Sequence, residues 1–299
     1  MIKDTFTIKS LENLTGIKVP TIRMWEKRYG ILTPTRSKTG IREYTIDELS
    51  LMLNIAFLNN HGWKISKIAR LSQKEIHASV NSLVLQKSNA HFDLEQFIIT
   101  MLTFNENEFN SIFKKLMKER SFENIFEQIF IPLLERVGIL WQTNTIEIIH
   151  EHFITSLISQ KLINQIENQK IVEDEDQKRY ILFLPKNEIH ELGLRYIQYK
   201  LIKANKLTVY LGNHTELAHL LRFGNNPQIE LIANLTVNPD NKSLGQYLES
   251  LKLFVDKTNL IIHLLGIQFN IHKVSRSPHK NINIYSLPEQ LMEQINLHE

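Results

Sequence analysis

The sequence predicts a multidomain protein of class α and α/β. It should hold an N-terminal winged helix-turn-helix, a central four-helix bundle and a C-terminal flavodoxin-like, doubly wound parallel sheet. Three observations favour this fold. Near the start, a short cationic helix runs directly into a cationic loop broken by Pro and Gly. The middle of the chain repeats apolar residues at three- and four-residue spacing, and the last third alternates short β-branched runs with helical stretches.

The N-terminal pattern is a helix pair followed by a hairpin. Residues 19–29 predict a helix, because Pro20 suits a first helical turn and Gly30 permits the left-handed backbone that ends one. Residues 9–15 predict the preceding helix, and residues 16–18 the tight turn between the two. The run TPTRSKTGIREY that follows is typical of a hairpin wing. Basic residues on so short a helix can also be no more than a solvated face.

The stretch FTIKSLENLTGIKVPTIRMWEKRYGILTPTRSKTGIREYTIDELSLM resembles the DNA-binding domain of the MerR family of transcription regulators, and the resemblance covers about the first 75 residues. It is specific at TIRMWEKRYG, TPTR and REY. The resemblance implies double-stranded DNA as a partner, with the second helix in the major groove and the wing on neighbouring phosphates. The implied DNA-binding residues are Thr21, Arg23, Trp25 and Arg28 on the helix, and Arg36, Lys38, Arg42 and Tyr44 on the wing.

Within that set we expect different roles. Arg23 and Arg28 should divide between base edges and phosphates, and Arg36 and Arg42 should mainly contact phosphates. The alternative for Trp25 is a place in the core, because large aromatic residues at helical spacing more often pack than touch bases. MerR-type heads bind two-fold sites as pairs, so the resemblance also implies a homo-oligomer, at least on DNA.

Charge and composition agree with a DNA-binding head on another body. Residues 1–75 hold 13 Lys and Arg against 7 Asp and Glu, whereas the remainder holds 22 against 25. The chain has no Cys, which excludes disulfides and thiolate metal sites. No apolar run approaches the roughly 20 residues that span a bilayer, and the first residues lack a signal-peptide core, so we expect a soluble, cytoplasmic protein with no membrane partner.

Changes of pattern set the expected domain boundaries. Pro132 should bend or interrupt the third bundle helix. The segment after the head is too polar and too short for the long dimerisation helix usual in the family, so pairing should run through the later domains. The boundaries are residues 1–75 for the head, 76–93 for a polar linker, 94–170 for the bundle, 171–178 for a charged linker and 179–299 for the sheet domain.

The bundle carries a motif that combines an aromatic residue with an acid–imidazole pair. Trp141 is followed nine residues later by Glu151 and His152. This spacing resembles the Trp-x9-Glu-His signature of the four-helix cap domain in cobalamin-dependent MerR-type repressors, the light-responsive regulators of carotenoid genes. The resemblance implies that these side chains cover the upper face of a cobalamin. The alternative is a dimerisation or spacer bundle with Trp141 in its core.

The loop after the first expected strand of the sheet domain carries a second motif. Glu188-x-His190-x-x-Gly193 resembles the Asp-x-His-x-x-Gly motif of cobalamin-binding flavodoxin-like domains. The resemblance implies that His190 is the lower ligand of cobalt, with Glu188 bonded to its other ring nitrogen. It also implies a ligand site outside the carboxyl ends of the strands.

Two later motifs depart from that family. Residues 234–236 (Asn-Leu-Thr) stand where the family has Ser-x-Leu or Ser-x-Thr, and Gly266-Ile267 stand where it has Gly-Gly. A small residue there admits the nucleotide tail of cobalamin between strand and helix, so we expect Ile267 to crowd it. The sheet domain can therefore also be a degenerate sensor that kept the fold and lost the ligand.

Together these patterns predict a sequence-specific DNA-binding transcription regulator, not an enzyme, with an effector-sensing region derived from a cobalamin-binding module. One alternative keeps the DNA binding and makes the body a ligand-free platform for protein interaction. An alternative of another class is a cobalamin-carrying enzyme subunit, such as a methyltransferase or mutase module. The basic head opposes that alternative, because a carrier subunit has no use for a recognition helix and wing.

Overall fold

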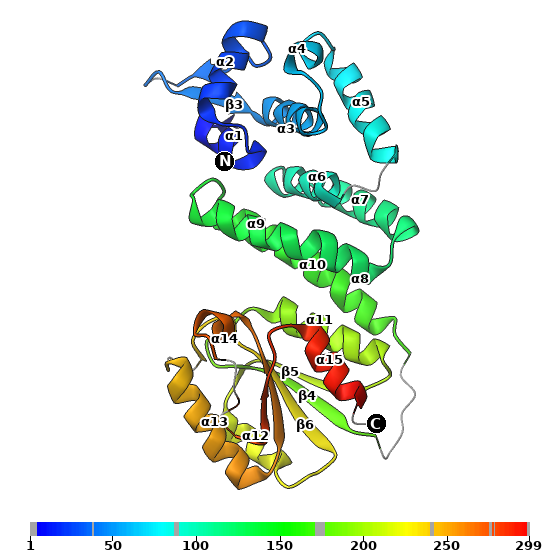
Figure 1. The fold of residues 1–299 in the computed structure, drawn as a ribbon, viewed down its shortest axis with the longest axis vertical. Coiled ribbons are helices and arrows are strands. Elements are labelled where there is room, and N and C mark those ends of the chain that lie inside the picture. The colour runs from blue at the N-terminus through cyan, green and yellow to red at the C-terminus, as the bar shows by residue number, and fades with distance from the viewer. Residues whose placement is uncertain are drawn as a thin grey trace. The chain divides into compact units, whose positions relative to one another are not determined.

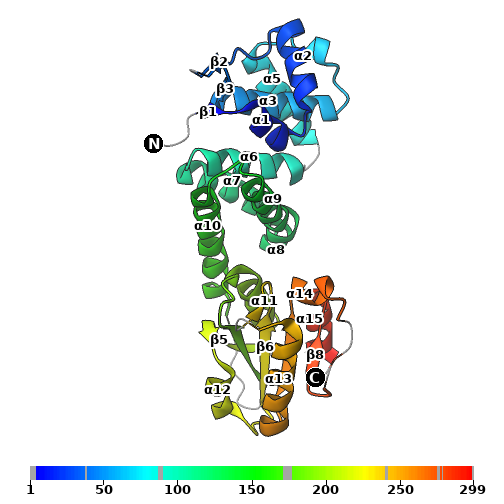
Figure 2. The same cartoon turned by 90° about the vertical axis from the view of Figure 1, so that its left-hand side faces the viewer.

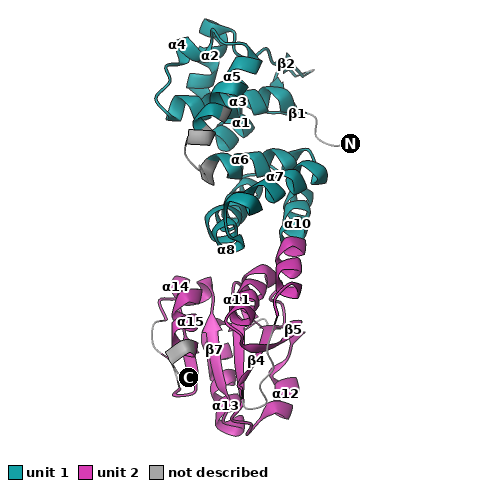
Figure 3. Cartoon of the chain, turned by 90° about the vertical axis from the view of Figure 1, so that its right-hand side faces the viewer, with its two compact units in different colours: residues 1–158 teal, residues 159–299 magenta. Residues whose placement is uncertain are grey.

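A computed structural model describes residues 5–37, 39–86, 90–170, 177–239, 242–274, 277 and 279–297. The chain divides into two compact units, residues 1–158 and 159–299, and the division falls inside helix α10 (Figure 3). The first unit holds the predicted head and most of the helical bundle, and the second holds the sheet. None of the helices in the described part of the chain is both long and apolar enough to cross a membrane.

The head is the predicted winged helix-turn-helix (Figure 1). Gly16 ends α1 and Gly30 ends α2, each at positive φ, as the sequence predicts. A capping box between Thr45 and Glu48 starts α3 directly after the wing. The elements are β1 (Thr5–Phe6), α1 (Ile8–Thr15), α2 (Val19–Tyr29), β2 (Thr35–Arg36), β3 (Arg42–Thr45), α3 (Ile46–Asn60) and α4 (Ile65–Ile68), and the three strands form an antiparallel sheet in the order β1-β3-β2.

Most of the polar linker predicted at residues 76–93 is instead helical. Helix α5 (Gln73–Gln86) packs against α3 and buries Ile76 and Val80, and the next helix begins at Ala90. A partner surface allows a largely polar segment to form a helix, because burial of its few apolar side chains holds it there. Residues 87–89 lie outside the described part of the chain.

The bundle has the predicted helical segments, which are α6 (Ala90–Leu102), α7 (Glu106–Glu119), the run α8–η1–α9, and α10 (Ile148–Glu167) (Figure 2). The third run contains α8 (Phe122–Ile125), the π-helical turn η1 (Phe126–Phe130) and α9 (Ile131–Gln142). Pro132 cannot donate to the turn before it, and the N–H of Ile131 bonds to the carbonyl of Phe126, five residues back. The predicted interruption at Pro132 is therefore a π turn within a continuous helix.

The second unit is the predicted doubly wound sheet. All strand pairs are parallel and the order is β5-β4-β6-β7-β8, so the chain steps outward from β4 in both directions. One face packs against α11 and α15 and the other against α12 and α13. The elements are β4 (Arg179–Pro185), α11 (Glu191–Lys203), β5 (Leu207–Thr215), α12 (Leu217–Leu220), η2 (Leu221–Phe223), β6 (Ile229–Asn234), α13 (Leu244–Thr258), β7 (Ile261–Leu265), α14 (Ile267–Ile271), β8 (Ile282–Ile284) and α15 (Pro288–Leu297). The charged linker predicted at 171–178 lies mostly outside the described residues.

Candidate DNA-binding and effector-binding sites

Helix α2 has one buried and one cationic face. Ile22 and Trp25 pack into the head, whereas Arg23, Lys27 and Arg28 are exposed. The structure therefore brings the predicted arginines to the surface and places Trp25, with 5% of its area exposed, in the core. Since buried aromatic rings cannot reach base edges, we assign Trp25 to the packing that orients the helix.

The wing presents its cations differently. Arg36 lies on β2 opposite Arg42 on β3; it is exposed, and its guanidinium donates to the carbonyl of Gly40 at the hairpin turn (Nη1···O 3.1 Å). Arg42 is partly buried and donates from Nε to the carboxylate of Glu26 on α2 (3.2 Å). Lys38 lies outside the described residues.

Glu26 ties the recognition helix to the wing. Besides Arg42, it accepts a hydrogen bond from the hydroxyl of Tyr44, which is completely buried. Burial, the hydrogen bond and the charge of Glu26 all raise the pKa of Tyr44, so the phenol keeps its proton. Tyr44 therefore holds the wing in place and is not itself exposed to DNA. Sequence reasoning missed Glu26; the available signal was a lone acid in the cationic second half of the helix.

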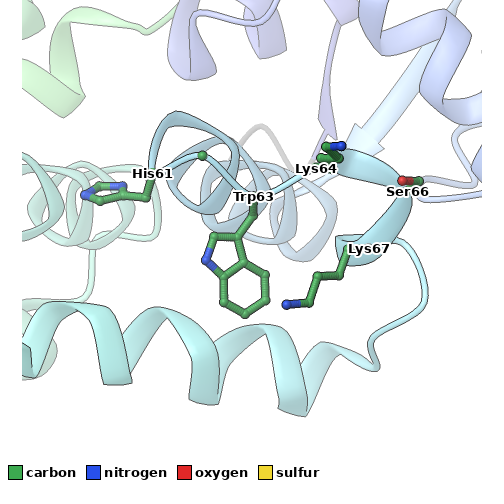
Figure 4. A pocket seen from close by; sticks show the side chains of 6 residues that line it. His61, Trp63, Lys64, Ser66 and Lys67 are labelled. Atoms are coloured by element: carbon green, nitrogen blue, oxygen red, sulfur yellow. The ribbon is translucent and has the colours of Figure 1, made fainter.

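A cavity of about 440 Å³ lies at the turn from α3 to α4, outside every motif that the sequence singled out. The ammonium of Lys67 lies 4.4 Å from the centroid of the Trp63 ring, and Figure 4 shows the two side chains pointing toward each other. The lining residues are His61, Gly62, Trp63, Lys64, Ser66 and Lys67.

In the second unit, the carboxylate of Glu188 is fully buried at the carboxyl end of β4. One oxygen bonds to Nδ1 (2.6 Å) and the backbone N–H of His190, and the other accepts the backbone N–H groups of Thr236 and Val237, which follow β6. Burial by itself would raise the pKa of Glu188, but these hydrogen bonds outweigh it and hold the pKa below its ordinary value.

The predicted acid–histidine pair is thus assembled. An Nδ1–H that donates to the carboxylate leaves the ring lone pair on Nε2, which is the arrangement of a metal-ligating histidine. About half of the His190 side chain is exposed, at the switch point between β4 and β6 where ligands of this fold bind.

Two glycines near this site are closely packed. A Cβ at Gly193 would lie 3.2 Å from the side-chain amide of Asn234, and one at Gly266 would lie 2.1 Å from the carbonyl oxygen of Leu235. The chain ends of β6 and β7 therefore pack directly on each other. Ile267, which we expected to crowd the tail, is instead 53% exposed, because the positive φ of Gly266 turns the chain into α14. The close contacts at the two glycines come from Asn234 and from the Leu235 backbone.

The bundle motif lies on a surface. Trp141, at the end of α9, is 47% exposed, so the alternative of a core tryptophan is wrong. On α10, Glu151 accepts a hydrogen bond from Thr155 (3.1 Å) and lies 3.6 Å from the exposed ring of His152. The exposed apolar residues Ile139, Ile148 and Ile149 surround the motif in sequence. An exposed indole among apolar neighbours can cover a flat ligand.

Comparison with known proteins agrees with this reading. The model of the MerR HTH family regulatory proteins matches residues 6–75, and the model of a B12 binding domain matches residues 93–164. The chain is 24% identical to the HTH-type transcriptional repressor CarH of Myxococcus xanthus over 200 residues, which is 65% of this chain and 66% of CarH. It is 24% identical to the repressor CarA of the same organism over 225 residues, 72% of this chain and 71% of CarA.

The fold has a counterpart among solved structures. The monomethylamine corrinoid protein of Methanosarcina barkeri superposes with a TM-score of 0.55 over 71% of this chain and 100% of that one, at 13% identity. That likeness shows a shared fold alone. The head therefore matches the MerR HTH family and most of the bundle matches a B12 binding domain, and the chain is homologous to the transcriptional repressors CarH and CarA.

Proposed function

We propose that the protein regulates transcription by binding specific double-stranded DNA through α2 and the wing, and that its remaining domains sense an effector. The observation that carries the proposal is the Glu26 bridge, which joins a cationic helix and a cationic hairpin into one surface. A helix of this size fits the major groove, and a hairpin beside it reaches the phosphates.

The side chains divide by exposure. Thr21, Arg23 and Arg28 on α2 are placed to contact bases and adjacent phosphates, and Arg36 on the wing is placed to contact phosphate. Arg42 contributes less charge to DNA than Arg36, since a carboxylate already pairs with it. Lys64 and Lys67, at the α3–α4 cavity, add cations to the head that we assign to the same phosphate backbone.

The test is selection of binding sequences from random DNA, followed by titration of the selected site at several salt concentrations. We expect Arg28→Ala to weaken binding and relax sequence preference. Arg36→Ala should weaken binding to all DNA sequences alike and reduce the salt slope by about one unit. Lys257→Ala removes an exposed cation from α13 in the other unit and serves as the control. A wild-type protein that enriches no sequence would refute the proposal.

We further propose that the protein binds its operator as a homo-oligomer, because one recognition helix reads only a few base pairs. Light scattering with and without the selected DNA tests this. A complex of one chain with one DNA duplex contradicts it.

The effector region fits a corrinoid only in part. Glu188 and His190 fit the ligation of cobalt, and Trp141, Glu151 and His152 fit the cover of a flat ring, whereas the close packing of Gly266 on the Leu235 backbone disfavours the insertion of a nucleotide tail. Bound cobalamin would supply a cobalt centre able to take an imidazole ligand. The geometry of this chain supports His190 as that ligand and opposes the insertion of the tail.

Absorption spectra of protein mixed with aquocobalamin in the dark decide whether His190 ligates cobalt despite the close packing at Gly266. Binding through His190 shifts the cobalt bands in wild-type protein and not in His190→Ala, and it raises the melting temperature. An unchanged spectrum together with an unchanged melting temperature at saturating ligand excludes cobalamin. Regulation then comes from another ligand or from a protein partner.

The rival class, a cobalamin-carrying enzyme subunit, draws on the corrinoid protein fold of the second unit. A fold can host many functions, so this likeness alone assigns none. The winged head with its exposed arginines favours the regulator, and the DNA selection above separates the two classes.

A further inference from the structure

The turn between α9 and α10 contacts the DNA-binding head. The side-chain amide of Asn13, on α1, donates to the hydroxyl of Thr145 in that turn (2.7 Å). The two residues are 132 positions apart in the sequence, and both belong to the first unit. Figure 1 shows α1 beside the turn that ends α9.

A second contact to α1 comes from helix α9, which precedes this turn. The guanidinium of Arg136, on α9, donates to the backbone carbonyl of Leu14 in the last turn of α1, and also to the carboxylate of Glu95 on α6 (3.3 Å). The carbonyls in the last turn of a helix have no partner within the helix, and a cation is favourable there. Gly16 already caps the carbonyl of Glu12, and Arg136 adds a cation at the carbonyl of Leu14; α1 has no basic residue of its own in its last turn.

The same turn carries the exposed indole of the bundle motif. The carbonyl of Trp141 accepts the N–H of Asn144, and the hydroxyls of Thr143 and Thr145 lie 3.0 Å apart. The side chain proposed to meet an effector, Trp141, thus lies only four positions before Thr145, whose side chain bonds to α1. Since α1 packs against α2, the path from Trp141 to the recognition helix is short and made of direct contacts.

We propose that the α9–α10 corner, residues 136–145, couples the effector-sensing bundle to the DNA-binding head, with Arg136 and Thr145 as positioning residues for α1. The proposal rests on the proposed function and names its regulation. The contacts reach α1 and leave the cationic face of α2 uncovered, so the docked head is the arrangement that binds DNA. A change at the Trp141 side of the corner loosens α1 and weakens DNA binding.

The chain offers a matched control for Arg136. Arg120 makes a largely buried ion pair with Asp93, another acid of α6 (2.7 Å), and Asp93 lies within the bundle. Loss of either arginine should destabilise the bundle to a similar degree. Of the two arginines, only Arg136 should affect DNA binding, because its guanidinium contacts α1.

The experiment measures DNA affinity and amide hydrogen exchange of the full chain on its selected DNA. We expect Arg136→Gln to weaken DNA binding about tenfold and Thr145→Val about threefold, since a charged hydrogen bond contributes more than a neutral one, while Arg120→Gln stays within about twofold of wild type. By reciprocity, DNA should slow exchange across residues 139–147 in wild type and Arg120→Gln, and not in Arg136→Gln.

Two results overturn the proposal. One is wild-type affinity in Arg136→Gln. The other is an equal loss of affinity in Arg120→Gln, which reduces the effect to general stability. Asn13→Ala and Thr145→Val combined should cost no more than either alone, and a fully additive double mutant contradicts the contact. If wild-type protein selects no DNA, the proposed function fails instead, and the two failures are distinguishable.

Discussion

Two carboxylates, the partly buried Glu26 in the head and the fully buried Glu188 in the sheet domain, each hold a functional side chain in place by different means. Glu26 joins the side chains of Arg42 and Tyr44, which lie 16 and 18 positions away. Glu188 binds the adjacent His190 and also two backbone N–H groups 48 and 49 positions away. The first carboxylate neutralises a cation within one continuous motif. The second joins the loop after β4 to the backbone after β6, so its loss should destabilise a larger part of its domain.

Of the changes to these carboxylates, we therefore expect Glu188→Ala to have the largest effect. It leaves buried backbone N–H groups of Thr236 and Val237 without acceptors, which we expect to destabilise the sheet domain by about 3 kcal/mol. Chemical denaturation measures the loss. Glu188→Gln retains acceptor oxygen and should lose about half as much. Equal stability of Glu188→Ala and wild type would show that Glu188 does not close the loop.

A third carboxylate, Glu95, sharpens the contrast because its pKa is raised, whereas that of Glu188 is lowered. Burial raises the pKa of Glu95 from 4.5 to about 7, against the lowering effect of Arg136. Between these values the folded state binds more protons than the unfolded state, so stability should fall as pH rises from about 4.5 to 7, by at most about 3 kcal/mol.

Denaturation across this pH range tests the slope. Glu95→Gln should remove most of it, and Glu108→Gln, at an exposed site on α7, should leave it unchanged. The Glu188 pKa is lowered, so the stability that its hydrogen bonds add is instead present above its ordinary pKa and lost in stronger acid. A flat wild-type profile between pH 4.5 and 7 contradicts the Glu95 prediction.

Glu26→Gln tests the head side of the comparison and should have a moderate effect on DNA binding. Without the carboxylate charge, the positive charge of Arg42 is no longer neutralised. Binding to unrelated DNA should therefore strengthen, and the salt slope should steepen by up to about one unit. Specific binding should gain less, because the wing is less firmly held. Glu43→Gln removes a neighbouring charge and leaves the bridge, so it should preserve the ratio of specific to unspecific affinity. An unchanged ratio in Glu26→Gln would show that the bridge does not set specificity.

The smallest expected effect is that of Trp141→Ala on stability. Because the indole is half-exposed, we expect a change below about 0.5 kcal/mol, in contrast to about 3–5 kcal/mol for Trp25→Ala, whose ring is in the core. Thermal melts of the two variants compare them directly. A large loss of thermal stability in Trp141→Ala would show that this side chain stabilises the fold.

Whole elements with a continuous pattern could be predicted from the sequence. The helix pair, the wing and the parallel sheet are specified by Gly16, Gly30 and by apolar periodicity, all of which act over a few residues. The pairing of Glu188 with His190 was predictable too, since the two lie in one short loop. The resemblance to known motifs supplied the roles, and the local spacing supplied the geometry.

The tertiary structure decided what local spacing leaves undetermined, namely which side chains the fold buries and which distant groups it joins. It placed Tyr44 and Trp25 in the core, made a helix of the polar segment beside α3, exposed Ile267 and packed Gly266 closely on the Leu235 backbone. It also brought Arg136 to α1 from 122 positions away. A sequence pattern reports periodicity along the chain, whereas burial and charge pairing depend on surfaces that exist only after remote segments pack together.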